Sequence, residues 1–243
     1  MNNDTSHVKT LGLIGGMSWE STVPYYQQIN QAVKAQLGGL HSARLILYSV
    51  DFAQVEHLQA TGQWAAAGEL LADVAKKLEL AGADALVLCT NTMHKVADAI
   101  TAAVNIPLLH IADPTALAIG QAGLKKVGLL GTRFTMEQDF YRSRLEQTHG
   151  LTVLTPPQAD RELVHQVIYE ELCLGQVRDT SRQHYLRVIT ELGAQGAQAI
   201  ILGCTEISLL IGPQDCPMPL FDTTQLHARS AAQWAMSVPW AGA

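Results

Sequence analysis

The sequence predicts an α/β fold built around parallel β-sheets. Two observations indicate it: short apolar strands alternate with amphipathic helices, and the pattern of the first half of the chain returns in the second half. A strand that is apolar at every position needs cover on both faces, which flanking helices supply in a parallel sheet. The 243 residues, 48% hydrophobic and 16% charged, suffice to bury such a core without disulfides or metal ions.

In the first half of the chain, the spacing of apolar residues and the glycine and polar residues at the boundaries predict each strand and helix. Strands are expected at residues 9–18, 44–52, 83–91 and 106–113, and helices at 18–36, 64–81 and 92–103. A further helix is expected at 226–237, close to the end of the sequence. Strands that alternate with helices in this way pair in parallel.

Three segments of the first half recur in the second half in the same order. TLGLIGGMS resembles KVGLLGTRF, and their first glycines lie 128 − 12 = 116 residues apart. GADALVLCTNT resembles GAQAIILGCTE at a spacing of 196 − 82 = 114, and IPLLH resembles MPLFD at 218 − 106 = 112. Three ordered matches at nearly one spacing indicate two copies of one unit, at about 9–113 and 117–223.

The repeat therefore predicts two pseudo-symmetric, Rossmann-like parallel-sheet domains. The first is expected to comprise residues 1–115 plus 222–243, and the second residues 116–221. Ligands of parallel sheets bind beyond the carboxyl ends of the strands. The active site is thus expected in the cleft between the two domains.

Charge and cysteine content exclude several classes of partner. A net charge of −6 with scattered Lys and Arg argues against nucleic acid and membrane surfaces. The polar first residues and the lack of a long apolar stretch predict a soluble, cytoplasmic protein. The four cysteines have no C-x-x-C or nearby histidine spacing, so we expect reduced thiols and no metal site. The early glycines read G-x-x-G-G rather than G-x-G-x-x-G, so no dinucleotide cofactor is expected.

The repeat also singles out a pair of side chains. It places Cys204 opposite Thr90, since 204 − 90 = 114, and leaves Cys89 one residue out of register, at a buried position. In both loops, CTNTMH and GCTEIS, a strand end is followed by polar residues and helical sequence, a setting that binds carboxylates. A helix start also lowers the pKa of a thiol, which makes Cys204 the expected reactive group. The alternative is that these residues only pack and cap helices.

The segments GLIGGMSWEST, LCTNTMH, LLGTRFTMEQDFY and ILGCTEI resemble signatures of the aspartate/glutamate racemase family, over about residues 9–236. The resemblance implies interconversion of L- and D-aspartate or glutamate without pyridoxal phosphate or another cofactor. Two groups on opposite faces of the α-carbon would act in turn as base and acid, in a preorganised site.

Most members of that family carry two cysteines, whereas this chain has Thr90 and Cys204. The pair resembles that of the L-aspartate/glutamate-specific racemase subgroup. A threonine hydroxyl is a far weaker acid than a thiol. We therefore expect asymmetric catalysis, in which Cys204 removes the proton of its preferred enantiomer more readily than Thr90 does from the other.

The resemblance also implies which residues bind the substrate. It does not identify the residue that binds the distal carboxylate. Asn91, Thr92 and Thr205 would bind the α-carboxylate, while Glu206 would orient the ammonium group or favour the helix dipole. The remaining expected cleft residues are Met17, Ser18 and Thr132. Arg133 is assigned either to the distal carboxylate or to the solvated surface, and no catalytic step is assigned to His94, Lys95 or His110. Cys173 stands where many relatives have lysine, and no arginine lies near residues 49–56, so a broader amino-acid range stays open.

Two other functions fit the same features. One is a decarboxylase or isomerase of the same superfamily that works with a single cysteine. The other is a non-catalytic amino-acid binding protein, since a two-lobed α/β cleft also closes around ligands in such binders. Helices rich in Ala and Leu favour a homodimer, with a small amino acid as the other expected partner.

Overall fold

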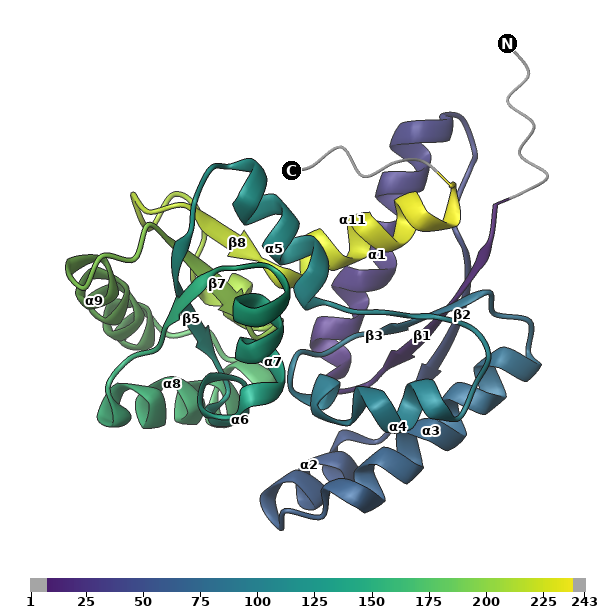
Figure 1. Ribbon diagram of the computed structural model, residues 1–243, viewed down its shortest axis with the longest axis horizontal. Coiled ribbons are helices and arrows are strands. Elements are labelled where there is room, and N and C mark those ends of the chain that lie inside the picture. Colours follow the sequence, from purple (N-terminus) through teal and green to yellow (C-terminus); the bar gives the residue numbers. More distant parts are fainter. Residues whose placement is uncertain (1–7, 238–243) are drawn as a thin grey trace. The chain divides into compact units, whose positions relative to one another are not determined.

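The computed structural model describes residues 8–237, which form two compact α/β units (Figure 1). The first unit runs to His110 and resumes at His227, and the second spans Ile111–Leu226. Each contains one four-stranded parallel sheet, as the sequence predicts. The expected domain limits, 1–115 with 222–243 and 116–221, extend outside the described residues and stay a prediction. Among residues 8–237, no helix combines the length and apolarity needed to cross a membrane.

The elements of the first unit alternate strand and helix, with the sheet order β2-β1-β3-β4. They are β1 (Thr10–Gly15), α1 (Trp19–Leu37), β2 (Arg44–Ser49), α2 (Phe52–Ala60), α3 (Trp64–Leu80), β3 (Ala85–Leu88), η2 (Thr92–Val96), α4 (Ala97–Ala102), β4 (Leu108–Leu109) and α11 (Thr223–Ala235), which begins in the second unit.

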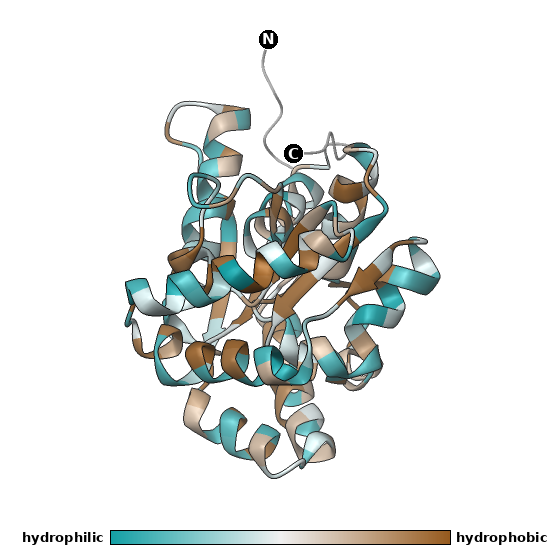
Figure 2. Ribbon diagram, turned by 90° about the vertical axis from the view of Figure 1, so that its left-hand side faces the viewer, coloured by the Kyte–Doolittle hydropathy of each residue, from teal (hydrophilic) through white to brown (hydrophobic). Residues whose placement is uncertain are grey.

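Both faces of the first sheet are buried. Leu13 and Val87 point to one face, where they pack with Tyr25 of α1 and with the alanines of α11. Ile14 and Leu88 belong to the apolar cluster of the other face, together with side chains of α3. Successive side chains of a strand point to opposite faces, so a strand covered on both sides must be apolar throughout. Figure 2 shows the result as brown strands among helices of mixed colour.

The second unit repeats this arrangement, with the sheet order β6-β5-β7-β8. Its elements are α5 (Ala112–Gln121), β5 (Lys126–Gly131), α6 (Arg133–Glu137), α7 (Asp139–Ser143), η3 (Arg144–Thr148), β6 (Thr152–Leu154), α8 (Gln158–Glu170), η4 (Leu172–Leu174), α9 (Asp179–Ala194), β7 (Ala199–Gly203), α10 (Ile207–Leu210) and β8 (Leu220–Asp222).

Strand register confirms the internal repeat. Gly12 of β1 lies beside Leu86 of β3, and Gly128 of β5 lies beside Ile200 of β7. The spacings are 128 − 12 = 116 and 200 − 86 = 114, the values found in the sequence. Equivalent strands therefore end at equivalent places in the two sheets, and so do the loops that follow them.

The four strands predicted in the first half are all longer than the observed ones, and two of them extend into the start of a helix. The run at 44–52 ends as a strand at Ser49, because the side chain of Asp51 accepts a hydrogen bond from the backbone N–H of Ala53 and starts helix α2. The run at 106–113 is a strand only at Leu108–Leu109, and α5 begins at Ala112. The helix expected at 92–103 is divided into η2 and α4.

Gly16, directly after β1, supplies a stability prediction. Its φ is +87°, and an added Cβ would lie 2.6 Å from the backbone nitrogen of Val50. Gly82 has a similar φ of +94° but nothing within 4 Å of an added Cβ. We expect Gly16→Ala to lower the free energy of unfolding by about 3 kcal/mol or more, and Gly82→Ala by about 1–2 kcal/mol. Urea denaturation of both variants checks this, and equal losses would contradict the packing account.

Candidate active site

Thr90 and Cys204 lie at equivalent strand ends, each in its own unit. In the first sheet Ile14 of β1 lies beside Leu88 of β3, and Thr90 follows two residues later. In the second sheet Leu202 of β7 lies beside β5, and Cys204 follows two residues later. Thr90 is 7% exposed and Cys204 8%, so both keep some accessible surface. The predicted equivalence of the two positions is therefore present in the separate sheets.

Cys89 is a packing residue, as its register predicts. It is fully buried in the apolar cluster of β1, β3, α1 and α11. Its Sγ lies 3.7 Å from the carbonyl oxygen of Val87, and burial raises the pKa of the thiol. A thiol without accessible surface and with a raised pKa is not a reactive group.

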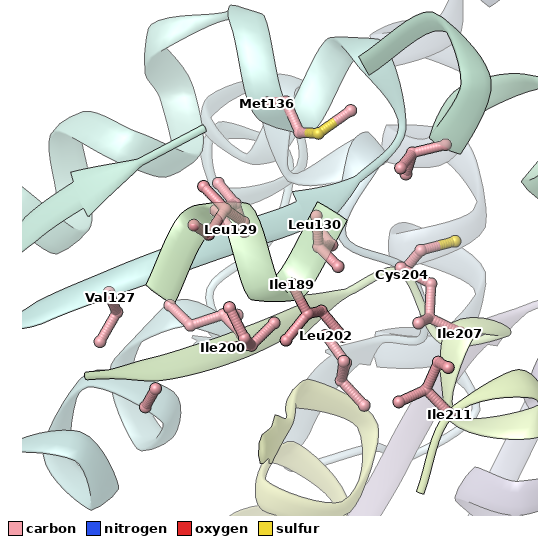
Figure 3. Packing of buried hydrophobic residues seen from close by; sticks show 14 of the residues in the cluster. Val127, Leu129, Leu130, Met136, Ile189, Ile200, Leu202, Cys204, Ile207 and Ile211 are labelled. Carbon is pink, nitrogen blue, oxygen red and sulfur yellow. The ribbon is translucent and has the colours of Figure 1, made fainter. Parts of the chain in front are cut away.

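Cys204 lies at the edge of the second unit's apolar cluster, just past the end of β7. Figure 3 shows its side chain close to Ile207, beyond Leu202. The Sγ atom donates a hydrogen bond to Oε2 of Glu206 at 2.9 Å. The same carboxylate oxygen accepts a hydrogen bond from Oγ1 of Thr205 at 2.8 Å. Glu206 is only 2% exposed, so this group of three side chains is shielded from water.

The expectation that a helix start lowers the pKa of Cys204 is wrong. Burial, and after it the negative charge of Glu206, hold the pKa of the Cys204 thiol well above its ordinary value. The helix that follows, α10, contains only four residues, Ile207–Leu210, and so has little dipole to oppose these effects. At neutral pH the resting group is therefore a thiol that donates to a carboxylate.

The loop after β3 holds three of the polar residues expected at the site in the first unit. Thr90, Asn91 and Thr92 are all buried, and Thr92 begins η2. Nδ1–H of His94 donates to the carbonyl oxygen of Thr90, with 2.7 Å between the atoms. His94 therefore holds the backbone that carries the Thr90 hydroxyl.

A tyrosine and a histidine beside this loop were not expected from the sequence. The ring centroid of His94 lies 4.4 Å from that of His110 and 6.1 Å from that of His227. Nε2 of His227 donates to the carbonyl oxygen of Leu109 at 2.8 Å, and its Nδ1 lies 2.9 Å from the hydroxyl of Tyr25. Helix α11 carries His227 to this sheet from far along the chain, so no local pattern could have indicated it.

The loops after β1 and β5 carry Met17, Ser18 and Thr132, all buried. The Ser18 side chain accepts from the backbone N–H of Ser21 and caps α1. The Thr132 side chain accepts from the backbone N–H of Thr135 and caps α6. Both hydroxyls thus act as helix caps, and their contact with a substrate stays a prediction.

The sequence matches the Asp/Glu/hydantoin racemase family over residues 14–231. The chain belongs to this family. A broad specificity amino-acid racemase of Bacillus subtilis (strain 168) is 25% identical over 228 residues, which cover 90% of this chain and 95% of that protein.

Solved structures agree with the assignment. A Yersinia pestis protein assigned to the Asp/Glu racemases is 63% identical with a TM-score of 0.87, and the match covers 94% of this chain and 99% of that one. An aspartate racemase homologue from Pyrococcus horikoshii OT3 is 34% identical with a TM-score of 0.81, at the same coverage. The family and these relatives support amino-acid racemase activity for this chain.

Arg133 and Cys173, the two positions considered for recognition of the substrate's side chain, lie in the second unit of this racemase family member. Arg133 is exposed, and its guanidinium lies 4.9 Å from the ring centroid of Phe134. Cys173 is half-buried in η4, and its negative charge, if formed, would raise the pKa of Cys204 further. In the first unit, Nζ of Lys95 lies 4.0 Å from the ring centroid of Trp64. No group of three His, Cys, Asp or Glu residues within 8–237 is arranged to hold a metal ion.

Proposed function

We propose that this chain interconverts L- and D-aspartate or glutamate by proton transfer at the α-carbon, without pyridoxal phosphate. Thr90 and Cys204 would act on opposite faces of that carbon. The observation that carries the proposal is the equivalence of the two positions: each follows the same strand of the same four-stranded sheet, in two copies of one unit. Racemisation needs such a pair, since the proton leaves one face and returns to the other.

In the direction that starts at Cys204, its thiolate takes the α-proton and becomes a thiol. The Thr90 hydroxyl then gives its proton to the opposite face of the carbanion. In the reverse direction the two residues exchange these roles. Asn91, Thr92 and Thr205 bind the α-carboxylate through fixed hydrogen bonds, and this preorganised, water-poor setting stabilises the carbanion while it exists.

The substrate class rests on the relatives and on the side chains present. The Yersinia pestis and Pyrococcus horikoshii proteins carry the names Asp/Glu racemase and aspartate racemase homologue, whereas the Bacillus subtilis protein is named for broad specificity. We therefore infer an acidic amino acid as the preferred substrate. Cys173, at the position where many relatives have lysine, leaves room for neutral side chains as well.

Incubation of the purified protein with L- or D-aspartate and glutamate in deuterium oxide tests this function. No cofactor is added, and α-proton loss and optical rotation are followed together. We expect rotation to fall to zero while the product carries deuterium at the α-carbon. Release of carbon dioxide from a malonate without such exchange would indicate the decarboxylase alternative. A bound but chemically unchanged amino acid would indicate a binding protein.

A further inference from the structure

Arg133 follows a strand end of the second unit that adjoins the strand end of Cys204. Gly131, the last residue of β5, pairs with Gly203, the last residue of β7. The two backbones are so close that a Cβ added to Gly131 would lie 2.8 Å from the carbonyl oxygen of Gly203. The segment that carries Arg133 and the segment that carries Cys204 therefore begin side by side.

The guanidinium of Arg133 is paired with no carboxylate among residues 8–237. Glu137 follows it by four residues in α6, but Oε1 of Glu137 accepts a hydrogen bond from Nε of Arg161 at 2.8 Å. The Arg133 side chain is exposed, and its guanidinium lies 4.9 Å from the ring centroid of Phe134. A guanidinium in this setting keeps its N–H donors available for an anionic ligand.

His165 of α8 holds the backbone of Arg133. Its Nδ1 accepts a hydrogen bond from the backbone N–H of Arg133 at 3.4 Å. Its ring centroid lies 5.9 Å from that of Phe134 and 4.6 Å from that of Tyr169. Burial, and after it the positive charge of Arg133, lower the pKa of His165, so the imidazole is uncharged at neutral pH. The histidine therefore positions the segment, while the guanidinium supplies the charge.

The charges beside Cys204 call for a cation when the substrate is acidic. The segments after β5 and β7, residues 132–137 and 204–210, contain one basic residue, Arg133. Glu206 places a carboxylate 2.9 Å from Sγ of Cys204. An acidic amino acid adds a second carboxylate to the one that every amino acid has, and like charges brought together without a counter-ion are costly.

We propose that Arg133 binds the distal carboxylate of an acidic amino acid held at Cys204, and so selects aspartate and glutamate over their amides. This inference rests on the proposed function and assigns the side chain of its substrate to one residue. The planar guanidinium donates two parallel N–H bonds to a carboxylate, an arrangement that the amide of asparagine or glutamine cannot match in charge.

Racemisation kinetics of Arg133→Gln with paired substrates test this role. The exposed side chain can be replaced without disturbing the hydrogen bond from the backbone to His165. We expect KM for L-aspartate and L-glutamate to rise about tenfold or more, the contribution of a hydrogen bond to a charged group, with kcat within about threefold. The preference for aspartate over asparagine, as the ratio of kcat/KM, should fall by the same factor.

An unchanged KM for both acidic substrates, or an equal loss with asparagine and glutamine, would overturn the assignment. Arg133→Lys keeps a charge at the position and should recover part of the lost affinity. A KM in Arg133→Lys as high as in Arg133→Gln would also contradict the pairing of charges.

Two further variants serve as controls. Arg142→Gln removes an arginine of the same unit whose Nη2 donates to Oδ1 of Asp139 at 3.1 Å, and it should leave KM within about twofold. Lys95→Gln removes the rival cation, the lysine of the first unit that lies over the ring of Trp64. A loss of the preference for acidic substrates in Lys95→Gln but not in Arg133→Gln would overturn the inference.

Equilibrium binding separates this inference from the proposed function. Isothermal titration calorimetry of Cys204→Ser with L-aspartate measures affinity without turnover, and the added change Arg133→Gln should raise Kd about tenfold or more. That rise, with no racemisation of any amino acid by the wild type, would sink the proposed function and leave the role of Arg133 in binding supported. Racemisation with an unchanged KM in Arg133→Gln would overturn the role of Arg133 alone.

Discussion

Replacement of Cys204 by alanine is expected to lower kcat/KM for racemisation by about 10³-fold or more, which corresponds to about 4 kcal/mol of transition-state stabilisation. The reason is that only Thr90 would remain as a base, and because its alkoxide is far scarcer at neutral pH than a thiolate, it removes an α-proton much more slowly than Cys204 does. Exchange of the α-proton with deuterium oxide should be lost together with racemisation. Proton NMR of aspartate and glutamate measures both.

The matched control for this variant is Cys216→Ala. Cys216 is a free thiol in the same unit, 7% exposed, and its Sγ accepts a hydrogen bond from the backbone N–H of Met218. It lies outside the loops that follow β5 and β7, so its removal should leave racemisation within about twofold of the wild type. Activity that survives in Cys204→Ala would remove Cys204 from its proposed role.

Replacement of Thr90 by alanine is expected to separate exchange from inversion. Cys204 can still remove the α-proton of one enantiomer and return a solvent-derived proton to the same face. Racemisation should therefore fall by about 10²-fold or more, a typical contribution of one acid–base group, while deuterium still enters that enantiomer. Chiral chromatography with mass detection of the α-deuterium distinguishes the two outcomes.

Two further changes at the same position complete this test. Thr90→Ser keeps the hydroxyl and should retain most of the racemisation. Thr90→Cys offers a more acidic group and should raise turnover of the enantiomer that depends on this face. If Thr90→Ala racemises as fast as the wild type, another group serves that face of the substrate.

The internal repeat made much of the fold predictable. Buried parallel strands need apolar residues at every position, so β1, β3, β5 and β7 stand out in the sequence, and their matched spacing gives the register. The same spacing singled out Thr90 and Cys204 as a pair and placed Cys89 in the core. The structure confirms that Cys89 is buried and that the other two follow equivalent strands, whereas their role in catalysis stays a prediction. Short elements were harder, since Asp51 starts helix α2 within a run that otherwise fits a strand.

The surroundings of the two residues could not be read from the sequence. His227 reaches Leu109 and Tyr25 through the packing of α11, a contact between residues 118 and 202 positions apart. The state of Cys204 was mispredicted because the helix after it is short and the Glu206 side chain turns back to the thiol. Sequence spacing predicts the backbone position of a residue. The protonation state of its side chain depends instead on burial and on the atoms that contact the titrating group.

A crystal structure of Cys204→Ser with bound L-aspartate or L-glutamate tests the central claim most directly. The account predicts one ligand whose α-carbon lies between the hydroxyl oxygens at positions 90 and 204, about 3–4 Å from each and on opposite faces. A ligand that contacts only one of the two positions, or both from the same face, would contradict it.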